Sequence, residues 1–180
     1  TMSGTGTTTA NGGIAFTTAF GKTLTRGLVL PATKSAVYTG TGGLVINNPG
    51  TFENSGTFDH QTDASISGTG TFNSPGTFLP KTSAGNVAIS CPFNNTGTLD
   101  VQTGELSLQD NGAHTGSFDA TGALLRFSGG TQTLSAATTV TGTAVEVTNG
   151  TITIGGSYDV TGTTAMTFGN LTFAPTSTVT

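Results

Sequence analysis

The chain has 180 residues, of which 28 are Gly, 41 are Thr and only 14 carry a charge. Its net charge of −4 argues against a nucleic-acid binder, because such proteins present a basic stripe. One third of the residues are hydrophobic and they recur in a pattern, so we expect an ordered domain with a narrow core.

The composition predicts an all-β fold. Threonine favours strands through its β-branch, while Gly and Asn supply turns. Twelve-residue windows with a helical apolar stripe do not occur, nor does an apolar stretch long enough to cross a membrane. The single cysteine, Cys91, cannot form an internal disulfide, and we expect it to be a small buried hydrophobe.

Upstream of residue 111 the chain is less regular. The first dozen residues, rich in Thr, Gly and Ser, predict a frayed coil at this end. Segments 31–36 and 79–86 contain Pro, Lys and other loop-forming residues, and they predict loops that protrude between strands.

A phrase that begins at Gly50 returns at Gly70 and again, in shorter form, at Phe93. An interval of about twenty residues is typical of a solenoid, in which each repeat is one coil stacked on the last. Stacking aligns two apolar columns, one polar column and one column of corner glycines: Phe52, Phe72 and Phe93; Phe58, Phe78 and Leu99; Asn54, Ser74 and Asn95; and Gly56, Gly76 and Gly97.

Short apolar-polar-apolar triplets follow nearly the same interval. They begin at Val87, Leu106, Leu125 and Val145. A period of two indicates strands with one face packed inward and the other in solvent.

From residue 111 the chain divides into three blocks of equal length, which align without gaps. This alignment predicts four columns and one corner: Phe118, Thr138 and Tyr158; Ala120, Val140 and Val160; Leu125, Val145 and Ala165; Phe127, Val147 and Thr167; and Gly130, Gly150 and Asn170 at a positive-φ corner.

We therefore predict an all-β parallel β-helix, a β-solenoid with coils of about 19–21 residues, forming a single domain over residues 1–180. Eight or nine coils at a strand spacing of about 4.8 Å make a rod roughly 40 Å long. The chain starts and stops within the pattern, so we expect a segment of a longer chain or a fibre protomer.

Candidate chemistry is sparse. Asp100, Asp119 and Asp159 occupy similar positions, and the first two would stack as a carboxylate pair. An acid–base pair needs a basic partner nearby, and the sequence offers none, so we expect solvated strand residues and no enzyme activity.

The two histidines, His60 and His114, are weak candidates for a metal site. His60 stands beside Asp59 and Asp63, yet a metal needs three or four converging ligands, and we expect His60 to be an exposed loop group. The sequence thus predicts no catalytic residue, no metal site and no cofactor. Three Asn-x-Thr sequons, at Asn94, Asn149 and Asn170, are expected from Thr richness and turn Asn alone.

Paired threonines suggest an ice-binding ladder as a further possibility. The register predicts Thr131/Thr133 on Thr151/Thr153, and Thr141/Thr143 on Thr161/Thr163. Leu171 and Phe173 in the next coil would interrupt such a ladder, so ordinary strand positions are the favoured interpretation.

The runs from Phe93 to Leu108 and from Thr115 to Gly130 resemble the β-strand repeats of large bacterial surface and secreted proteins. These are adhesin, autotransporter-passenger or filamentous-haemagglutinin-like parallel β-helices. The resemblance implies a stalk, adhesive rod or fibre and carries no catalytic motif.

The sequence therefore predicts a structural or adhesive rod, extracellular or at the cell surface. Its partner would be a second copy at the rod's end or further coils of the same polypeptide, with neither nucleic acid nor membrane insertion. The alternative is a polysaccharide- or glycan-binding solenoid, for which Tyr38 and Tyr158 are the candidate aromatics, although Tyr158 falls in an inward column. Ice binding is third.

Overall fold

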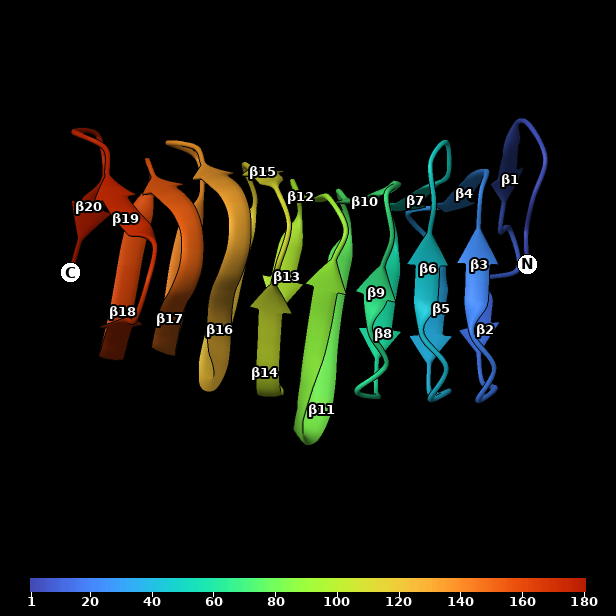
Figure 1. Cartoon of the computed structure of the whole chain (residues 1–180), viewed down its shortest axis with the longest axis horizontal. Helices are drawn as coiled ribbons and strands as arrows, with labels where there is room; N and C mark the ends of the chain where they lie inside the picture. The colour runs from blue at the N-terminus through green and yellow to red at the C-terminus, as the bar shows by residue number, and fades with distance from the viewer.

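The computed structural model describes residues 1–81 and 85–180. Within them the chain is all-β and winds as a parallel β-solenoid of about 8 turns, with the two termini at opposite ends of the rod (Figure 1). This confirms the predicted fold class. Because the regular structure is all strand, the described residues contain no helix able to span a bilayer.

Each turn supplies three strand segments, which stack on those of the neighbouring turns as three faces. Face 1 contains β1 (Thr7–Thr9), β4 (Gly27–Leu30), β7 (Thr51–Asn54), β10 (Thr71–Ser74), β12 (Phe93–Asn95), β15 (Gly112–His114) and β19 (Asn170–Phe173). Face 2 contains β2 (Ile14–Phe16), β5 (Ser35–Tyr38), β8 (Thr57–His60), β13 (Thr98–Asp100) and β20 (Thr178–Val179). Face 3 contains β3 (Lys22–Leu24), β6 (Leu44–Ile46), β9 (Ile66–Ser67) and β14 (Thr103–Leu108).

Four longer strands begin on face 2 and bend through a corner onto face 3. They are β11 (Thr77–Ser90), β16 (Ser117–Leu134), β17 (Thr139–Ile154) and β18 (Ser157–Met166), and both β16 and β17 continue onto face 1. The strand ladders are parallel, as expected when every strand pairs with its equivalent one turn away.

The ladder of face 1 is interrupted between β12 and β15. Here the amide of Ala113 donates to the side-chain oxygen of Asn94 at 3.0 Å, and the amide of Asn95 donates to Nδ1 of His114 at 3.1 Å. Two side chains thus replace carbonyl acceptors and keep these amides paired at the junction.

The predicted aromatic columns are confirmed. Phe72 pairs in register with both Phe52 and Phe93, and the Phe52 and Phe72 rings stack with centroids 5.2 Å apart. Phe78 stacks on Phe58 at the same centroid separation and meets Phe72 edge to face at 5.3 Å. Both columns are buried, so they fill the interior of the central turns.

The corner between faces 1 and 2 is tight, and the predicted column of glycines lies there. A Cβ atom added at Gly76 would overlap the carbonyl oxygen of Gly56, and one at Gly97 would overlap that of Gly76. Inside this corner the amide of buried Asn54 donates to the Ser74 hydroxyl at 3.0 Å, which confirms that step of the polar ladder. Asn95 instead donates to the carbonyl of Ser117, in the following turn.

The number of residues that separates stacked partners along the chain varies more than the predicted 19–21. It is smallest between Val140 and Tyr158 and largest between Leu28 and Phe52.

On face 2 the gapless alignment of residues 111–170 is wrong. Phe118 pairs with Val140 and not with Thr138, because the turn at 135–138 is longer than those at 115–116 and 155–156. Ala120 accordingly pairs with Gly142 in place of Val140.

On face 3 the first two members of each predicted column are confirmed and the third is wrong. Leu125 pairs with Val145 and Phe127 with Val147, but the next partners are Thr164 and Met166 in place of Ala165 and Thr167. The following corner shifts as well. Gly130 and Gly150 have positive φ as expected, whereas the third positive φ belongs to Gly169, and Asn170 is already in β19.

The irregular segments were only partly predicted. A turn occupies 31–34 before β5 begins at Ser35, and β1 pairs with β4, so the first coil is formed where fraying was expected. The predicted loop at 79–86 is wrong at Leu79 and Pro80, which pair with β8, and a register shift lies between Lys81 and Asn86. The centre of that segment, 82–84, lies outside the described residues.

We predict that Phe72→Ala costs about 3–5 kcal/mol of unfolding free energy, because the stacked rings above and below cannot collapse into the cavity. Phe20→Ala is the control, since Phe20 is 82% exposed. Chemical denaturation followed by circular dichroism checks both, and equal stability of the two variants would contradict the stacked core.

We also predict that Gly76→Ala destabilises the rod by roughly 1–3 kcal/mol, because the added methyl group must push two turns apart. At Gly12 no heavy atom lies within 4 Å of an added Cβ, so Gly12→Ala should leave the melting temperature nearly unchanged. A neutral Gly76→Ala would show that the corner is looser than its geometry indicates.

Candidate functional site

The predicted carboxylate pair is stacked, but no basic group completes it among the contacts of the described residues. Asp100 pairs in register with Asp119, and Asp159 is separated from them by Thr141. Asp119 accepts hydrogen bonds from the amide and hydroxyl of Thr121, and Asp100 accepts one from Gln102. These carboxylates order the turns that follow them, and acid–base chemistry would need a partner that neither contact supplies.

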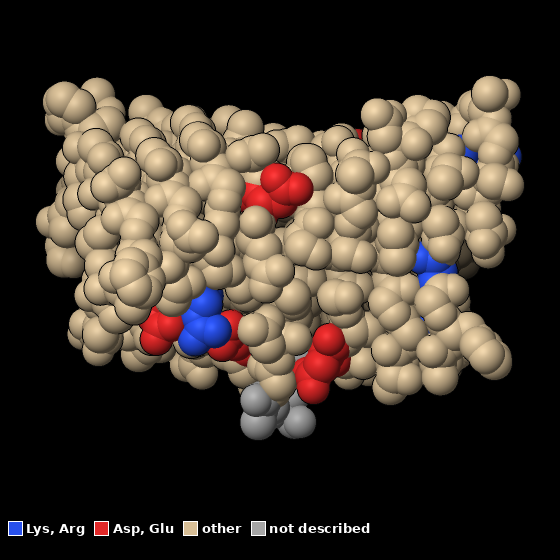
Figure 2. Space-filling view, in the orientation of Figure 1, with Lys and Arg blue, Asp and Glu red and all other residues tan. Residues whose placement is uncertain are grey.

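A second group of acids is neutralised on face 3. Arg126 Nε lies 2.8 Å from Glu146 Oε2, and its NH1 group lies 2.5 Å from Glu105 Oε1. Asn86 donates to Glu105 from the preceding turn. The guanidinium thus joins three successive turns, and this ladder fixes their register on a face that is otherwise sparsely charged (Figure 2).

His60 is buried, so its expected place in an exposed loop is wrong. It follows Asp59 in β8, and because successive strand residues point to opposite faces, Asp59 pairs with Lys81 outside, at 3.3 Å, while His60 points inward. Its ring lies 4.7 Å from that of Tyr38 and meets that of Phe58 edge to face at 5.7 Å. Burial lowers the pKa of His60 to about 4.

His114 is also buried, within the junction of β12 and β15. Its Nδ1 accepts from the Asn95 amide, so its Nε2 carries the proton and donates to Gln132 Oε1 at 2.7 Å. Burial lowers the pKa of this imidazole to about 4. The described residues contain no group of three or more His, Cys, Asp or Glu that could hold a metal ion.

Other candidates from the sequence are buried or hydrogen-bonded. Tyr38 and Tyr158 are 0% and 3% exposed, so neither is the exposed aromatic that glycan stacking requires. Cys91 is buried as predicted, and desolvation raises the pKa of its thiol to about 12. The sequon residue Asn94 donates to Asn73 and accepts from Ala113, so its amide is occupied.

Of the two predicted threonine ladders, one forms and extends into the next turn, and the other does not form. Thr131 and Thr133 stack on Thr151 and Thr153 as expected, and the next turn continues this outward column with Asn170 and Thr172. Leu171 and Phe173 alternate with that column and stack on Ile152 and Ile154. The second expected ladder is wrong, because Thr141 pairs with Asp159.

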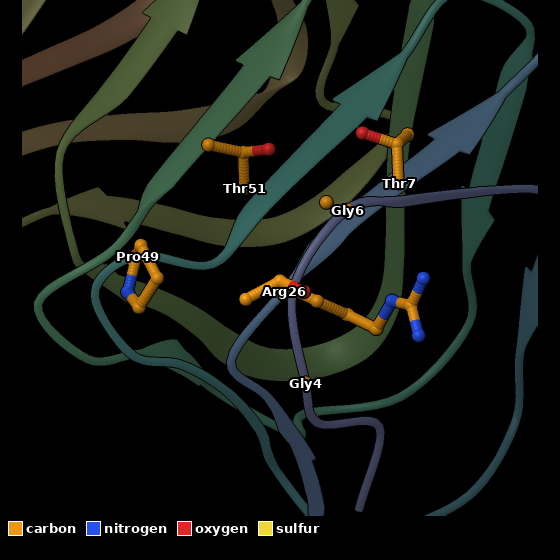
Figure 3. A pocket seen from close by; sticks show the side chains of 8 residues that line it. Gly4, Gly6, Thr7, Arg26, Pro49 and Thr51 are labelled. Carbon is orange, nitrogen blue, oxygen red and sulfur yellow. The ribbon is translucent and has the colours of Figure 1, made fainter.

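A cavity of about 330 Å³ opens at the corner between faces 3 and 1, near the N-terminal end. Residues 4–7, Arg26, Gly27, Pro49 and Thr51 line it, and these come from three successive turns (Figure 3). Sequence analysis missed this cavity. The available signal was charge, since residues 1–52 contain Lys22, Arg26 and Lys34 and no acid.

One wall of the cavity is formed where Thr7, Gly27 and Thr51 stack on face 1. On the outward side of face 1, Gly27 stands in register between Thr7 and Thr51, and a Cβ atom added at Gly27 would lie 2.8 Å from the Thr7 hydroxyl. The Thr7 side chain therefore already occupies the space that a side chain at Gly27 would need. Figure 3 shows the Gly4–Gly6 segment passing close to Arg26, and a Cβ atom added at Gly6 would lie 3.8 Å from the Arg26 guanidinium.

We predict that the rod loses stability as pH falls from about 6.5 to about 4. The unfolded chain takes up protons on His60 and His114 in this window, whereas the folded chain does not, because its histidine pKa values are near 4. The expected loss is roughly 1.4 kcal/mol per pH unit for each histidine. Denaturation midpoints at pH 7 and 4.5 check this, and His114→Gln should flatten the dependence; equal midpoints would contradict it.

Comparisons with known proteins give no relative for this arrangement: no family model, curated protein or solved structure matches the chain.

Proposed function

We propose that this chain is a structural or adhesive rod that works outside the cell or at its surface. The observation that carries the proposal is the continuity of the stacked interior, in which the turns bury side chains of all three faces against their neighbours. A rod held by parallel backbone ladders and a continuous core resists bending and proteolysis along its length. The resemblance of its repeats to bacterial adhesin stalks supports the same function.

The chemistry of the described side chains also supports a mechanical function. Both histidines and the cysteine are buried, and Arg126 neutralises two of the acids. The stacked pair Asp100–Asp119 orders local turns. What the rod presents to solvent is mainly Thr, Asn and backbone, which suits a surface that holds its shape.

We further propose that the C-terminal end of the rod is covered by another coil, from a second copy or from further polypeptide. Met166, Phe173 and Val179 stack on the buried residues Val147, Ile154 and Tyr158, yet they are 52%, 38% and 56% exposed. Their strands present free backbone groups beside this apolar layer, and such an edge pairs readily with another strand. A contact that joins unlike ends repeats without closing and builds a fibre.

The alternative function is a polysaccharide- or glycan-binding solenoid. Burial of Tyr38 and Tyr158 removes the aromatic platform on which that alternative first rested. A different observation now favours it, the polar cavity beside Arg26.

We predict that the 180-residue chain associates end to end as its concentration rises. Sedimentation velocity should show a concentration-dependent series, and electron microscopy should show filaments one rod wide. Single rods at every concentration would contradict self-association, and would leave further coils of the same polypeptide as the cover of that end.

A matched pair of variants separates end contacts from general stickiness. Val179→Lys places a charge in the apolar layer of the last turn and should abolish association. Phe168→Lys is the control, because Phe168 is 73% exposed and lies in a turn outside that layer, so its association should persist. Equal loss in both variants would contradict docking through the strand ends.

A further inference from the structure

We propose that the cavity beside Arg26 binds a carboxylate-bearing sugar, such as a uronic acid residue of an acidic polysaccharide. This inference deepens the alternative glycan-binding function, which rests on the same cavity, and does not depend on the rod function. A volume of about 330 Å³ is at the small end of ligand pockets and suits one sugar ring.

The charge of the site comes from one guanidinium with unused donors. Arg26 has five N–H groups, and among the described residues its one hydrogen bond joins NH1 to the Ser3 carbonyl at a long 3.4 Å. Its Nε is buried without a partner, and it takes part in none of the ion pairs of the described residues. An arginine in this state offers a fork of donors that a planar carboxylate satisfies with two parallel hydrogen bonds.

The surroundings select for an anion. None of the described residues that line the cavity is acidic, and residues 1–52 carry three cations against no acid. The first acid in the chain is Glu53, which follows Thr51 by two residues on the outward side of β7 and does not line the cavity. This distribution also explains why Arg26 is unpaired while Arg126, near two glutamates, is not.

The rest of the lining suits sugar hydroxyls. Thr7 and Thr51 stand on either side of Gly27 in the stack of face 1, and both line the cavity with their hydroxyl groups. Thr5 and the backbone of Gly4 and Gly6 add further polar groups, and Pro49 supplies one apolar surface. Such a lining recognises a ring with many hydroxyls better than an apolar ligand.

The test is a titration of ¹⁵N-labelled protein with sodium glucuronate, glucose, acetate and sulfate, followed by amide chemical shifts. We expect glucuronate to shift the amides of Gly4, Gly6 and Gly27 with a millimolar dissociation constant, and glucose, acetate and sulfate to bind at least tenfold more weakly. Equal binding of acetate or sulfate would reduce the cavity to a simple anion site and overturn the sugar assignment. Absence of localised shifts with glucuronate would overturn the site altogether.

Variants assign the contacts. Arg26→Gln should weaken glucuronate binding about tenfold or more, the loss expected for a charge-assisted hydrogen bond, with Arg26→Lys intermediate. Lys34→Gln is the matched control, because it removes the same charge from the same end of the rod but does not line the cavity. Unchanged binding in Arg26→Gln, or equal loss in Lys34→Gln, would overturn the role of Arg26.

Gly27→Ala tests the cavity wall at Thr7 without changing charge. Its added methyl group meets the Thr7 hydroxyl inside the cavity, so we expect binding to fall while the spectrum elsewhere stays the same. This variant also keeps the proposal testable if Arg26→Gln fails to fold, since full affinity in Gly27→Ala would overturn the proposed position of the sugar.

Discussion

Neighbouring coils lie at backbone hydrogen-bonding distance all along this rod, and that spacing limits the size of the side chain at each corner. At the turn from face 1 to face 2 the carbonyl of one coil fills the space where the next coil would place a Cβ atom, so Gly56, Gly76 and Gly97 recur there. With the corner closed in this way, the strands on both sides stack in register, and the phenylalanines of β7, β10 and β12 come into contact. The repeating phrase in the sequence is a direct consequence of this one steric requirement.

The narrow interior explains how the buried polar side chains are accommodated. A coil with three short strands encloses only a few inward side chains, so a histidine on the inner side of a strand has no route to solvent. His114 is accommodated by accepting a backbone hydrogen bond from Asn95 and donating to Gln132, in place of a regular ladder at the junction of β12 and β15. His60 has aromatic neighbours for its ring, and burial lowers its pKa to about 4, as it does for His114.

The outer surface divides along the rod axis. Residues 1–52 carry cations alone, and Arg26 remains with unused donors beside a cavity lined by threonines. Further along, acids order turns or pair with Arg126, and the outward strand positions are mainly neutral. A rod with one chemically distinct end is consistent with a structural shaft that carries a recognition site.

The sequence by itself determined the solenoid, its approximate period and the inward columns of the central turns, because equal turn lengths at 55–56, 75–76 and 96–97 preserve the alternation of strand residues. Tertiary structure decided the rest. The longer turn at 135–138 moved Val140 under Phe118, which no residue-by-residue alignment reveals, since insertions are absorbed wherever a corner has room. The inward orientation of His60 depended on β8 continuing through it, and the cavity at Arg26 depended on three turns, distant in sequence, meeting at one corner. Stacking partners follow from the local pattern, whereas burial and cavities follow from which turns lie side by side.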